Sequence, residues 1–293
     1  MPKVRYKPRK FRADARERIE QANEIIEEYR AQGYVLTLRQ LYYQFVARDL
    51  IANEQREYKR LGDLVNRARL AGLIDWEAIE DRTRNIESLP HWESPADAVG
   101  AVAEQYREDK WGDQAVRIEV WVEKEALAGV FAGVCEELQV PWFACRGYVS
   151  QSEQWSAGQR FARINWSGQR PIVLHFGDHD PSGIDMTRDN AKRLTLFAEY
   201  GVEVRRLALN MDQVVEHQPP PNPAKVTDAR FAGYEAEHGD QSWELDALPP
   251  DVLTGLVRDA VIDLRDGERW QESEAREQDA RGRLEAVAAD MAT

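Results

Sequence analysis

Cysteine is scarce in this sequence, since Cys135 and Cys145 are the only two among 293 residues. They form no spacing typical of a metal site, and we expect both to be buried as small apolar side chains in a reducing compartment. Long apolar runs are missing too, so the sequence predicts no membrane-spanning helix. No apolar segment follows the basic N-terminus, so we expect no secretory signal. These absences favour a cytoplasmic protein, and the short chain fits a prokaryotic or viral one.

Basic residues are fewer than acidic ones, and the net charge is −13. That value argues against a nucleic-acid partner, but the charge is unevenly distributed. Residues 1–92 carry 18 Lys and Arg against 15 Asp and Glu, whereas the remainder has a net charge of −16. Residues 1–12 contain six basic residues and no acidic one. A basic N-terminal region fits contact with the phosphates of double-stranded DNA, although a solvated basic tail accounts for the charge equally well.

The N-terminal region has the pattern of a small helical DNA-binding domain. Helical periodicity and Gly stop signals predict three helices, at residues 14–31, 38–50 and 53–71. Residues 73–84 (LIDWEAIEDRTR) have the pattern of a short β-hairpin or wing. Three helices and a wing predict a winged-helix domain within residues 1–92, whose third helix reads DNA. That helix carries the DNA-binding candidates Lys59, Arg60 and Arg67, although ordinary solvated helix faces carry similar charges.

A connector with one helix, at residues 93–115, separates this region from a second pattern that fills residues 116–293. Apolar runs predict strands at residues 116–122, 140–145, 171–176 and 202–209, with helices between them. This alternation is typical of a parallel sheet covered by helices. The chain then continues through a proline-rich turn at residues 217–224 to one or two charged helices at 251–291. The predicted fold is therefore α/β plus α+β.

Carboxylates follow two of the predicted strands. Glu123 follows the first, and Asp178 and Asp180 follow the third. Ligands gather at the carboxyl ends of parallel strands, and Mg²⁺ prefers oxygen donors, so the three carboxylates predict a magnesium site. One alternative is that Asp180 caps the following helix and Asp178 caps a turn. Glu125 competes with Glu123 as a ligand, although an acid in the first turn of a helix is favourable without a metal.

These segments resemble a known family. VEKEAL (residues 122–127) and GDHDPSG (177–183) resemble the two acidic motifs of a Toprim domain, the magnesium-binding domain of topoisomerases, primases and some nucleases. TLRQLYYQ (37–44) resembles the catalytic-tyrosine motif of the DNA topoisomerase VI A subunit and its meiotic double-strand-break relatives. In that family a winged-helix domain precedes the Toprim domain, which is the order expected here.

The second predicted helix contains two neighbouring tyrosines. On a helical wheel, Tyr42 lies with Leu38 on the apolar face, and Tyr43 lies roughly 140° away, with Arg39 one turn before it. We therefore expect Tyr43 to be exposed beside Arg39, whose guanidinium favours the phenolate and binds phosphate. The nucleophile of the family aligns with Tyr43. The alternative is an ordinary half-exposed surface tyrosine.

The resemblance implies a DNA-cleaving transesterase. Tyr43 would attack a DNA phosphate and form a 5′-phosphotyrosyl link, with Mg²⁺ held by Glu123, Asp178 and Asp180. The family pairs the tyrosine of one subunit with the metal of the other, which implies a homodimer, and it works with a separate ATPase subunit. Arg146 stands where the family has a lysine, and we expect it to contact phosphate.

Two other functions stay open. The first is a Toprim nuclease that uses water as its nucleophile, and the second is a non-enzymatic winged-helix DNA-binding protein. The sequence assigns no role to two distinctive segments, NPAKVTDAR (residues 222–230) and WELDALP (243–249).

Overall fold

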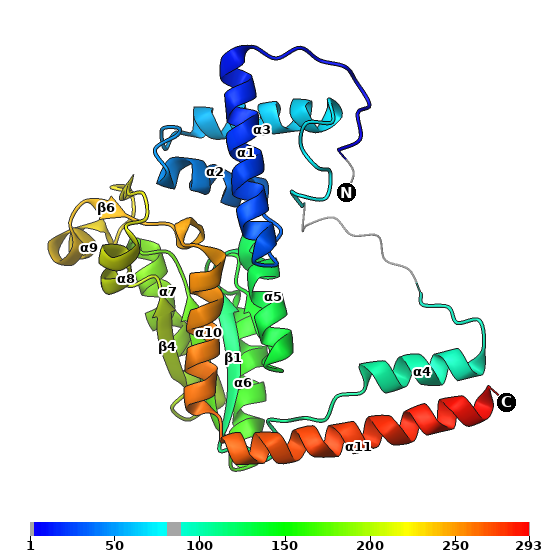
Figure 1. Cartoon of the computed structure of the whole chain (residues 1–293). Coiled ribbons are helices and arrows are strands. Elements are labelled where there is room, and N and C mark those ends of the chain that lie inside the picture. Colours follow the sequence, from blue (N-terminus) through cyan, green and yellow to red (C-terminus); the bar gives the residue numbers. More distant parts are fainter. Residues whose placement is uncertain (1–2, 81–88, 293) are drawn as a thin grey trace.

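The computed structural model describes residues 3–80 and 89–292 and shows a mixed α/β protein. A helical unit at the N-terminus stands on a unit built around a parallel sheet, and a two-helix arm extends from the base of the sheet unit (Figure 1). Among the described residues, no helix is long and apolar enough to cross a membrane.

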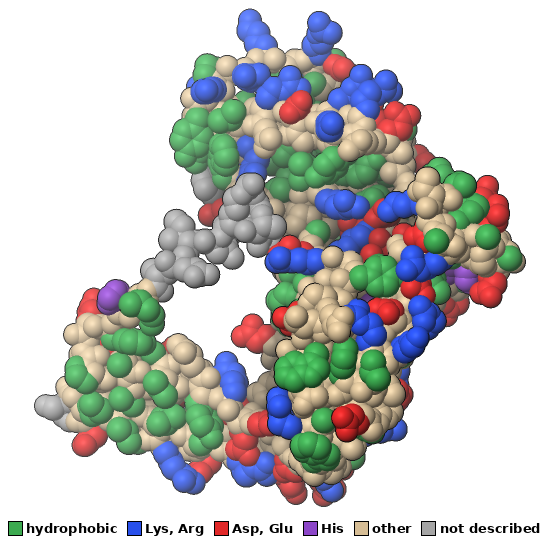
Figure 2. Space-filling view, turned by 180° about the vertical axis from the view of Figure 1, so that it is seen from behind, with side chains coloured by type: hydrophobic (Ala, Val, Ile, Leu, Met, Phe, Trp, Pro, Cys, Tyr) green, Lys and Arg blue, Asp and Glu red, His purple; other side chains and the backbone are tan. Residues whose placement is uncertain are grey.

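Three helices form the N-terminal unit, as the sequence predicts: α1 (Ala13–Ala31), α2 (Leu38–Ala47) and α3 (Gln55–Leu70). Helix α2 begins at a capping box, in which Thr37 and Gln40 each bond the backbone N–H of the other. The apolar faces of α1, α2 and α3 meet in one core that contains Leu41 and Phe45, both fully buried. The outer end of this unit carries many of the Lys and Arg side chains visible in Figure 2.

The predicted hairpin at residues 73–84 is not formed in the part that the structure describes, residues 73–80. This segment makes turns and a single parallel bridge between Ile79 and Leu36. Two of its side-chain contacts run to the helices: Arg30 pairs with Asp75 at 3.0 Å, and Arg69 donates to the carbonyl of Ile79 at 2.8 Å. These contacts fix the chain against α1 and α3. Residues 81–84 of the prediction lie outside the described residues.

Four parallel strands form the sheet of the second unit, in the order β2-β1-β3-β4. They are β1 (Val116–Val122), β2 (Trp142–Ala144), β3 (Arg170–Phe176) and β4 (Glu203–Ala208), which confirms the predicted strands. Alternation along β1 sends Val120 to one face of the sheet and Trp121 to the other. Both faces are therefore buried.

Helices cover the two faces. α5 (Ala128–Glu137) and α10 (Pro250–Leu264) share a core with one face, and α6 (Gln151–Trp166) and α7 (Pro181–Ala198) share a core with the other. The remaining short elements of this unit are η1 (Glu125–Leu127), α8 (Met211–His217), β5 (Asn222–Pro223), α9 (Phe231–His238), β6 (Gln241–Ser242) and η2 (Leu245–Ala247). Cys135 and Cys145 are buried as predicted, and burial raises the pKa of each thiol to about 12.

The arm pairs α4 (Pro95–Gln105) with α11 (Gly267–Met291), which pack side by side (Figure 1). The single helix expected in the connector is thus present, and the region 251–291 forms two helices. Trp270 anchors the base of α11 by packing edge-on against Trp111, with ring centroids 5.7 Å apart. Hydrophobic side chains lie over the surface of the arm (Figure 2).

Candidate active site

Glu123 and Asp178 meet because their strands are neighbours. Val122 of β1 pairs with Phe176 of β3, so both acids leave the sheet at the same edge. The Glu123 N–H donates to the Phe176 carbonyl at 2.8 Å, and the Asp178 N–H donates to Oε2 of Glu123 at 2.8 Å. The structure therefore brings together two of the three predicted metal ligands.

Two glycines make this approach possible. A Cβ atom at Gly177 would lie 3.0 Å from Oε2 of Glu123, and one at Gly183 would lie 2.2 Å from the Asp178 carbonyl oxygen. The first contact is tight and the second is a clash with backbone. Glycine at these positions lets the first turn of α7 and the Glu123 carboxylate close around Asp178.

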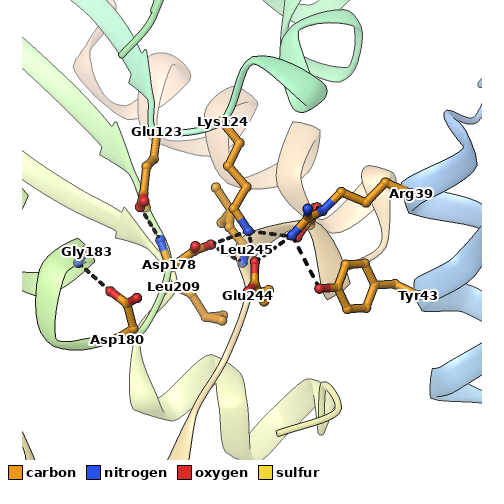
Figure 3. Close-up of polar contacts among 12 residues, drawn as sticks. Arg39, Tyr43, Glu123, Lys124, Asp178, Asp180, Gly183, Leu209, Glu244 and Leu245 are labelled. Atoms are coloured by element: carbon orange, nitrogen blue, oxygen red, sulfur yellow. Dashed lines mark hydrogen bonds and ion pairs between the residues drawn. The ribbon is translucent and has the colours of Figure 1, made fainter. Parts of the chain in front are cut away.

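Asp180 begins α7, as the capping alternative proposed. Its Oδ1 accepts from the Gly183 N–H at 2.6 Å and from the Ser182 hydroxyl at 3.0 Å, and Figure 3 shows the side chain turned toward Gly183. Asp178 caps no local turn. Its Oδ1 instead accepts from the Leu245 N–H at 2.7 Å, across 67 residues of chain.

Each of these carboxylates uses one oxygen for structure. Within the described residues, Oε1 of Glu123 and the Oδ2 atoms of Asp178 and Asp180 accept no hydrogen bond. The donor set, three hard oxygens with a surplus of negative charge, therefore fits a divalent cation. However, no group of three His, Cys, Asp or Glu side chains in the described parts of the chain is arranged to hold a metal ion. Sharing one cation thus requires side-chain movement, above all by Asp180.

The pKa values of these acids reflect the same surplus of negative charge. Burial, with Glu123, Glu244 and Asp246 nearby, raises the pKa of Asp178 to about 8 even though Lys124 opposes the rise. Burial also raises the pKa of Glu123. The Lys124 ammonium lies 2.9 Å from Oδ1 of Asp178 and partly compensates the acids.

Lys124 belongs to an ionic network that the sequence did not reveal, shown in Figure 3. Its ammonium also contacts Glu244 and lies 3.0 Å from Oδ1 of Asp246. Arg39 approaches from α2, with Nε 2.5 Å from Oδ2 of Asp246 and Nη2 3.0 Å from Oε2 of Glu244. Burial alone would lower the pKa of Lys124 and Arg39, but the acids hold both above their ordinary values. The segment WELDALP, which had no assigned role, thus joins the two units.

Tyr43 is buried, so the prediction of an exposed tyrosine is wrong. Only 5% of Tyr43 is exposed, as for Tyr42. The wheel assumed one buried face, whereas the opposite side of α2 packs against η2, and Ala247 of η2 joins the core of the helical unit. The two units therefore bury Tyr43 between them.

The ionisation of Tyr43 also departs from expectation. Arg39 Nη2 donates to the Tyr43 hydroxyl at 3.5 Å, a long contact, and its guanidinium lies 5.6 Å from the ring centroid. Burial, followed by the charges of Asp246 and Glu244, nevertheless raises the pKa of Tyr43 above its ordinary value, against the opposite effect of Arg39 and Lys124. Arg39 therefore does not create a phenolate in this state.

One pocket nevertheless brings together four of the five predicted catalytic and metal-binding residues, while the fifth, Glu123, lines a neighbouring cleft. Arg39, Tyr43, Asp178 and Asp180 line a cavity of about 430 Å³ at the junction of the two units. Segment 222–230, the other segment without a role, contributes Asn222 and Lys225 to its wall, and the Asn53 amide donates to Oδ1 of Asn222 at 2.6 Å. Figure 2 shows charged side chains of both signs gathered along this junction.

Arg206 is another residue that the sequence did not reveal, and it holds the turn between β3 and α7 from inside the protein. Arg206 of β4 donates to the carbonyl oxygens of Gly177, Asp178 and Gly183 at 3.0, 2.6 and 2.9 Å. Burial lowers the pKa of its guanidinium to about 10, while the nearby carboxylates act to raise it. Arg206 is thus a positioning residue for the turn between β3 and α7.

The DNA-binding candidates lie in two places. Lys59, Arg60 and Arg67 are exposed on α3, where Arg60 pairs with Glu57 at 2.7 Å and Arg67 donates to the carbonyl of Asp63 at 3.0 Å. Arg146 lies after β2, pairs with Glu125, and lines a cleft together with Glu123 and Lys124. Of the four, Arg146 is the one that shares a cleft with the carboxylates.

In comparisons with known proteins, no family model matches the chain, and no curated protein matches it significantly.

Proposed function

We propose that this protein is a DNA-cleaving transesterase in which Tyr43 is the nucleophile, similar to the topoisomerase VI A subunit whose motifs it resembles. The observation that carries the proposal is the shared pocket of Tyr43, Arg39, Asp178 and Asp180. Helices α1–α3 would then form the winged-helix domain, and the parallel sheet with its acidic turns would form the Toprim domain.

In the proposed reaction, the Tyr43 hydroxyl oxygen bonds to a DNA phosphorus and the bond from that phosphorus to the 3′ oxygen breaks. The phenol loses its proton and the departing 3′ oxygen gains one, so the products are a 5′-phosphotyrosyl link and a 3′ hydroxyl. Glu123, Asp178 and Asp180 would hold Mg²⁺, which when bound supplies positive charge to the phosphate and the leaving oxygen. Arg39 of the pocket wall and Lys124, which contacts Asp178, bind the phosphate in exchange for Glu244 and Asp246.

The raised pKa of Tyr43 sets a condition on this mechanism. The phenol is protonated at neutral pH, so proton removal must accompany the attack. Entry of a phosphate between Tyr43 and the acids would replace negative carboxylates as partners of Arg39 and bring the substrate to the hydroxyl.

A metal-dependent nuclease is the second candidate, and the burial of Tyr43 favours it. In that reaction water attacks the phosphorus, and Tyr43 only lines the pocket. The carboxylates and Mg²⁺ are common to both candidates, so their substitution does not separate the two.

The proposal extends to partners. A double-strand break needs two sites, so the substrate is double-stranded DNA and the active species is a homodimer; strand passage would need a separate ATPase subunit. Each chain already encloses Tyr43 with its own Asp178 and Asp180, so we propose that each copy cuts with its own tyrosine. This differs from the exchange between subunits that the resemblance implies.

Covalent capture of DNA tests the proposal. The protein is incubated with supercoiled DNA and Mg²⁺, denatured, and assayed for protein attached to 5′ ends. We expect an adduct with the wild type and with Tyr42→Phe, whose phenol is also buried and donates to Asn53 at 3.0 Å, and none with Tyr43→Phe. If Tyr43→Phe still cuts DNA and no adduct forms, the result supports the nuclease. DNA binding without any cutting supports the non-enzymatic protein.

A further inference from the structure

A second cleft continues from the Tyr43 pocket along the end of the sheet. Arg39 lines both that pocket and a cleft of about 380 Å³ that contains Lys124 and Arg146. Arg146 and Glu125 in turn line a third cleft, of about 610 Å³, beside β2. Shared walls therefore connect Tyr43 to the edge of the sheet through a path that passes three cations.

The residues that line the path change from charged to aromatic at Arg146. Beyond it, the wall of the β2 cleft is aromatic, with Trp142, Phe143 and Tyr148. β2 is the edge strand of the sheet, so no strand within residues 3–80 and 89–292 covers this side. Trp142 is 36% exposed and Tyr148 is 41% exposed, so both rings are accessible to a ligand in the cleft.

The aromatic wall is held in place. Tyr148 donates from its hydroxyl to Oδ2 of Asp185 at 2.6 Å, and the Arg230 guanidinium lies 5.2 Å from its ring centroid. Phe143 packs edge-on against the buried Trp121, with centroids 5.3 Å apart. Tyr148 and Phe143 are thus held in place before any ligand binds, which lowers the entropy cost of stacking against this wall.

Arg146 stands at the boundary between the charged and the aromatic parts. Its side chain is 70% exposed, and its backbone has the left-handed φ of +55°, which is uncommon outside glycine. Glu125 is its partner, but an ion pair this exposed to solvent is weak and exchanges readily for a phosphate.

We propose that the β2 cleft is a nucleobase-binding subsite. An unpaired stretch of the DNA bound at the Tyr43 pocket would extend along Arg39 and Lys124, place a phosphate on Arg146, and stack a base on Trp142 or Tyr148. Cations followed by ordered aromatic rings are the combination that binds single strands without sequence preference. The volume of the cleft lies within the ~300–1,000 Å³ range of small-ligand sites.

Binding of a single-stranded oligonucleotide tests the subsite in the full chain. A fluorescein-labelled 12-mer of thymidylate is compared with an abasic 12-mer of the same charge, by anisotropy in EDTA so that no cleavage occurs. We expect Trp142→Ala to weaken binding of the thymidylate strand by about 5- to 150-fold and binding of the abasic strand far less. Trp142→Phe, which keeps a stacking face, should restore most of the affinity.

Trp166→Ala is the matched control. Trp166 is 81% exposed and ends α6, while Ser150 and Glu153 at the other end of that helix border the cleft, so its loss should leave binding unchanged. Equal affinity of the wild type for the two strands, or equal losses in the two tryptophan variants, would overturn the proposal. A change in the number of chains per particle in solution on Trp142→Ala would overturn it as well. Such a change would show that the open edge of β2 pairs with another copy of the chain.

The subsite rests on the proposed function in taking DNA as the ligand and the Tyr43 pocket as its binding site, but not in taking Tyr43 as the nucleophile. Because the assay measures binding without metal, it gives its result even if Tyr43→Phe still cuts DNA. Failure of the adduct test would therefore remove the transesterase and leave the subsite standing, and failure of the stacking test would do the reverse.

Discussion

Arg39 and Asp246 lie 207 positions apart in the chain, yet Nε of Arg39 donates to Oδ2 of Asp246 at 2.5 Å. The Asp246 side chain is completely buried, whereas 43% of the Arg39 side chain is exposed. The other oxygen of Asp246 faces Lys124 at 3.0 Å. A single carboxylate thus compensates one cation from the helical unit and one from the sheet unit, and the junction between the units depends on it.

Replacing the Asp246 carboxylate should lower the free energy of unfolding. Asp246→Ala leaves Arg39 and the largely buried Lys124 without one of their shared partners. Removing one member of a fully buried pair costs about 3–5 kcal/mol, and the exposure of Arg39 reduces our expectation to about 2–3 kcal/mol. Urea unfolding followed by circular dichroism measures this loss. Glu244→Gln, at a residue that is 29% exposed, is the control and should cost less; an equal or larger loss there would assign the junction to Glu244.

The close approach at Gly183 gives a second prediction. Gly183→Ala places a methyl group where the Asp178 carbonyl oxygen lies 2.2 Å away, so the turn must shift, at a cost of about 1–3 kcal/mol. Gly282→Ala, in α11 and with nothing within 4 Å, should instead stabilise by about 0.5–1 kcal/mol. Chemical denaturation of both variants provides the measurement. Two variants of equal stability would show that α7 does not pack against Asp178 as described.

Magnesium should stabilise the folded protein through the same acids. At a free Mg²⁺ concentration ten times the dissociation constant, linkage gives a gain of about 1.4 kcal/mol over EDTA. Thermal melting of Glu123→Gln should show no such gain, whereas Glu125→Gln, beside Arg146, should keep it. The opposite result would make Glu125 the ligand. Equal gains in both variants would place the metal elsewhere.

The N-terminal unit should respond to acid through Asp75. The Glu77 N–H donates to Oδ1 at 2.9 Å and Arg30 to Oδ2 at 3.0 Å, and these contacts hold the pKa of Asp75 below its ordinary value despite burial. Because the unfolded chain takes up the proton first, the contribution is complete above the ordinary pKa of ~4 and is lost as the pH falls through the lower, folded value. The free energy of unfolding of Asp75→Asn, measured with urea, should therefore fall less between pH 5 and pH 3 than that of the wild type. Parallel curves would contradict this assignment.

Local signals in the sequence were sufficient for most of the framework. Helical periodicity, the Gly stop signals and the apolar runs of β1 and β3 act within a few residues, so they identify the helices and two buried strands. Neighbouring parallel strands then bring Glu123 next to Asp178. Within the described residues 73–80 the predicted hairpin is not formed. Arg30 and Arg69 bind that segment to the helices, and such partners lie beyond the range of any strand pattern.

The remainder of the site depends on distant contacts. A helical wheel describes one buried face, and Tyr43 lies on a second face of α2 that η2 covers. Glu244 and Asp246 occur in a short segment whose composition resembles many exposed turns. Only the folded chain shows that they meet Arg39 and Lys124, because no local rule pairs residues separated by 120 positions or more.

The order of the pocket-forming segments along the chain has a consequence for protein synthesis. A ribosome releases α2 with Tyr43 long before it releases Asp246, which closes the junction. Until then Asp178 lacks the Leu245 amide, and Arg39 and Lys124 lack two of the carboxylates that compensate them. Contacts across such a long stretch also form late, since loop closure precedes them. The pocket is therefore complete only after translation of this region has finished, because the residues that close it come about 200 positions after Tyr43.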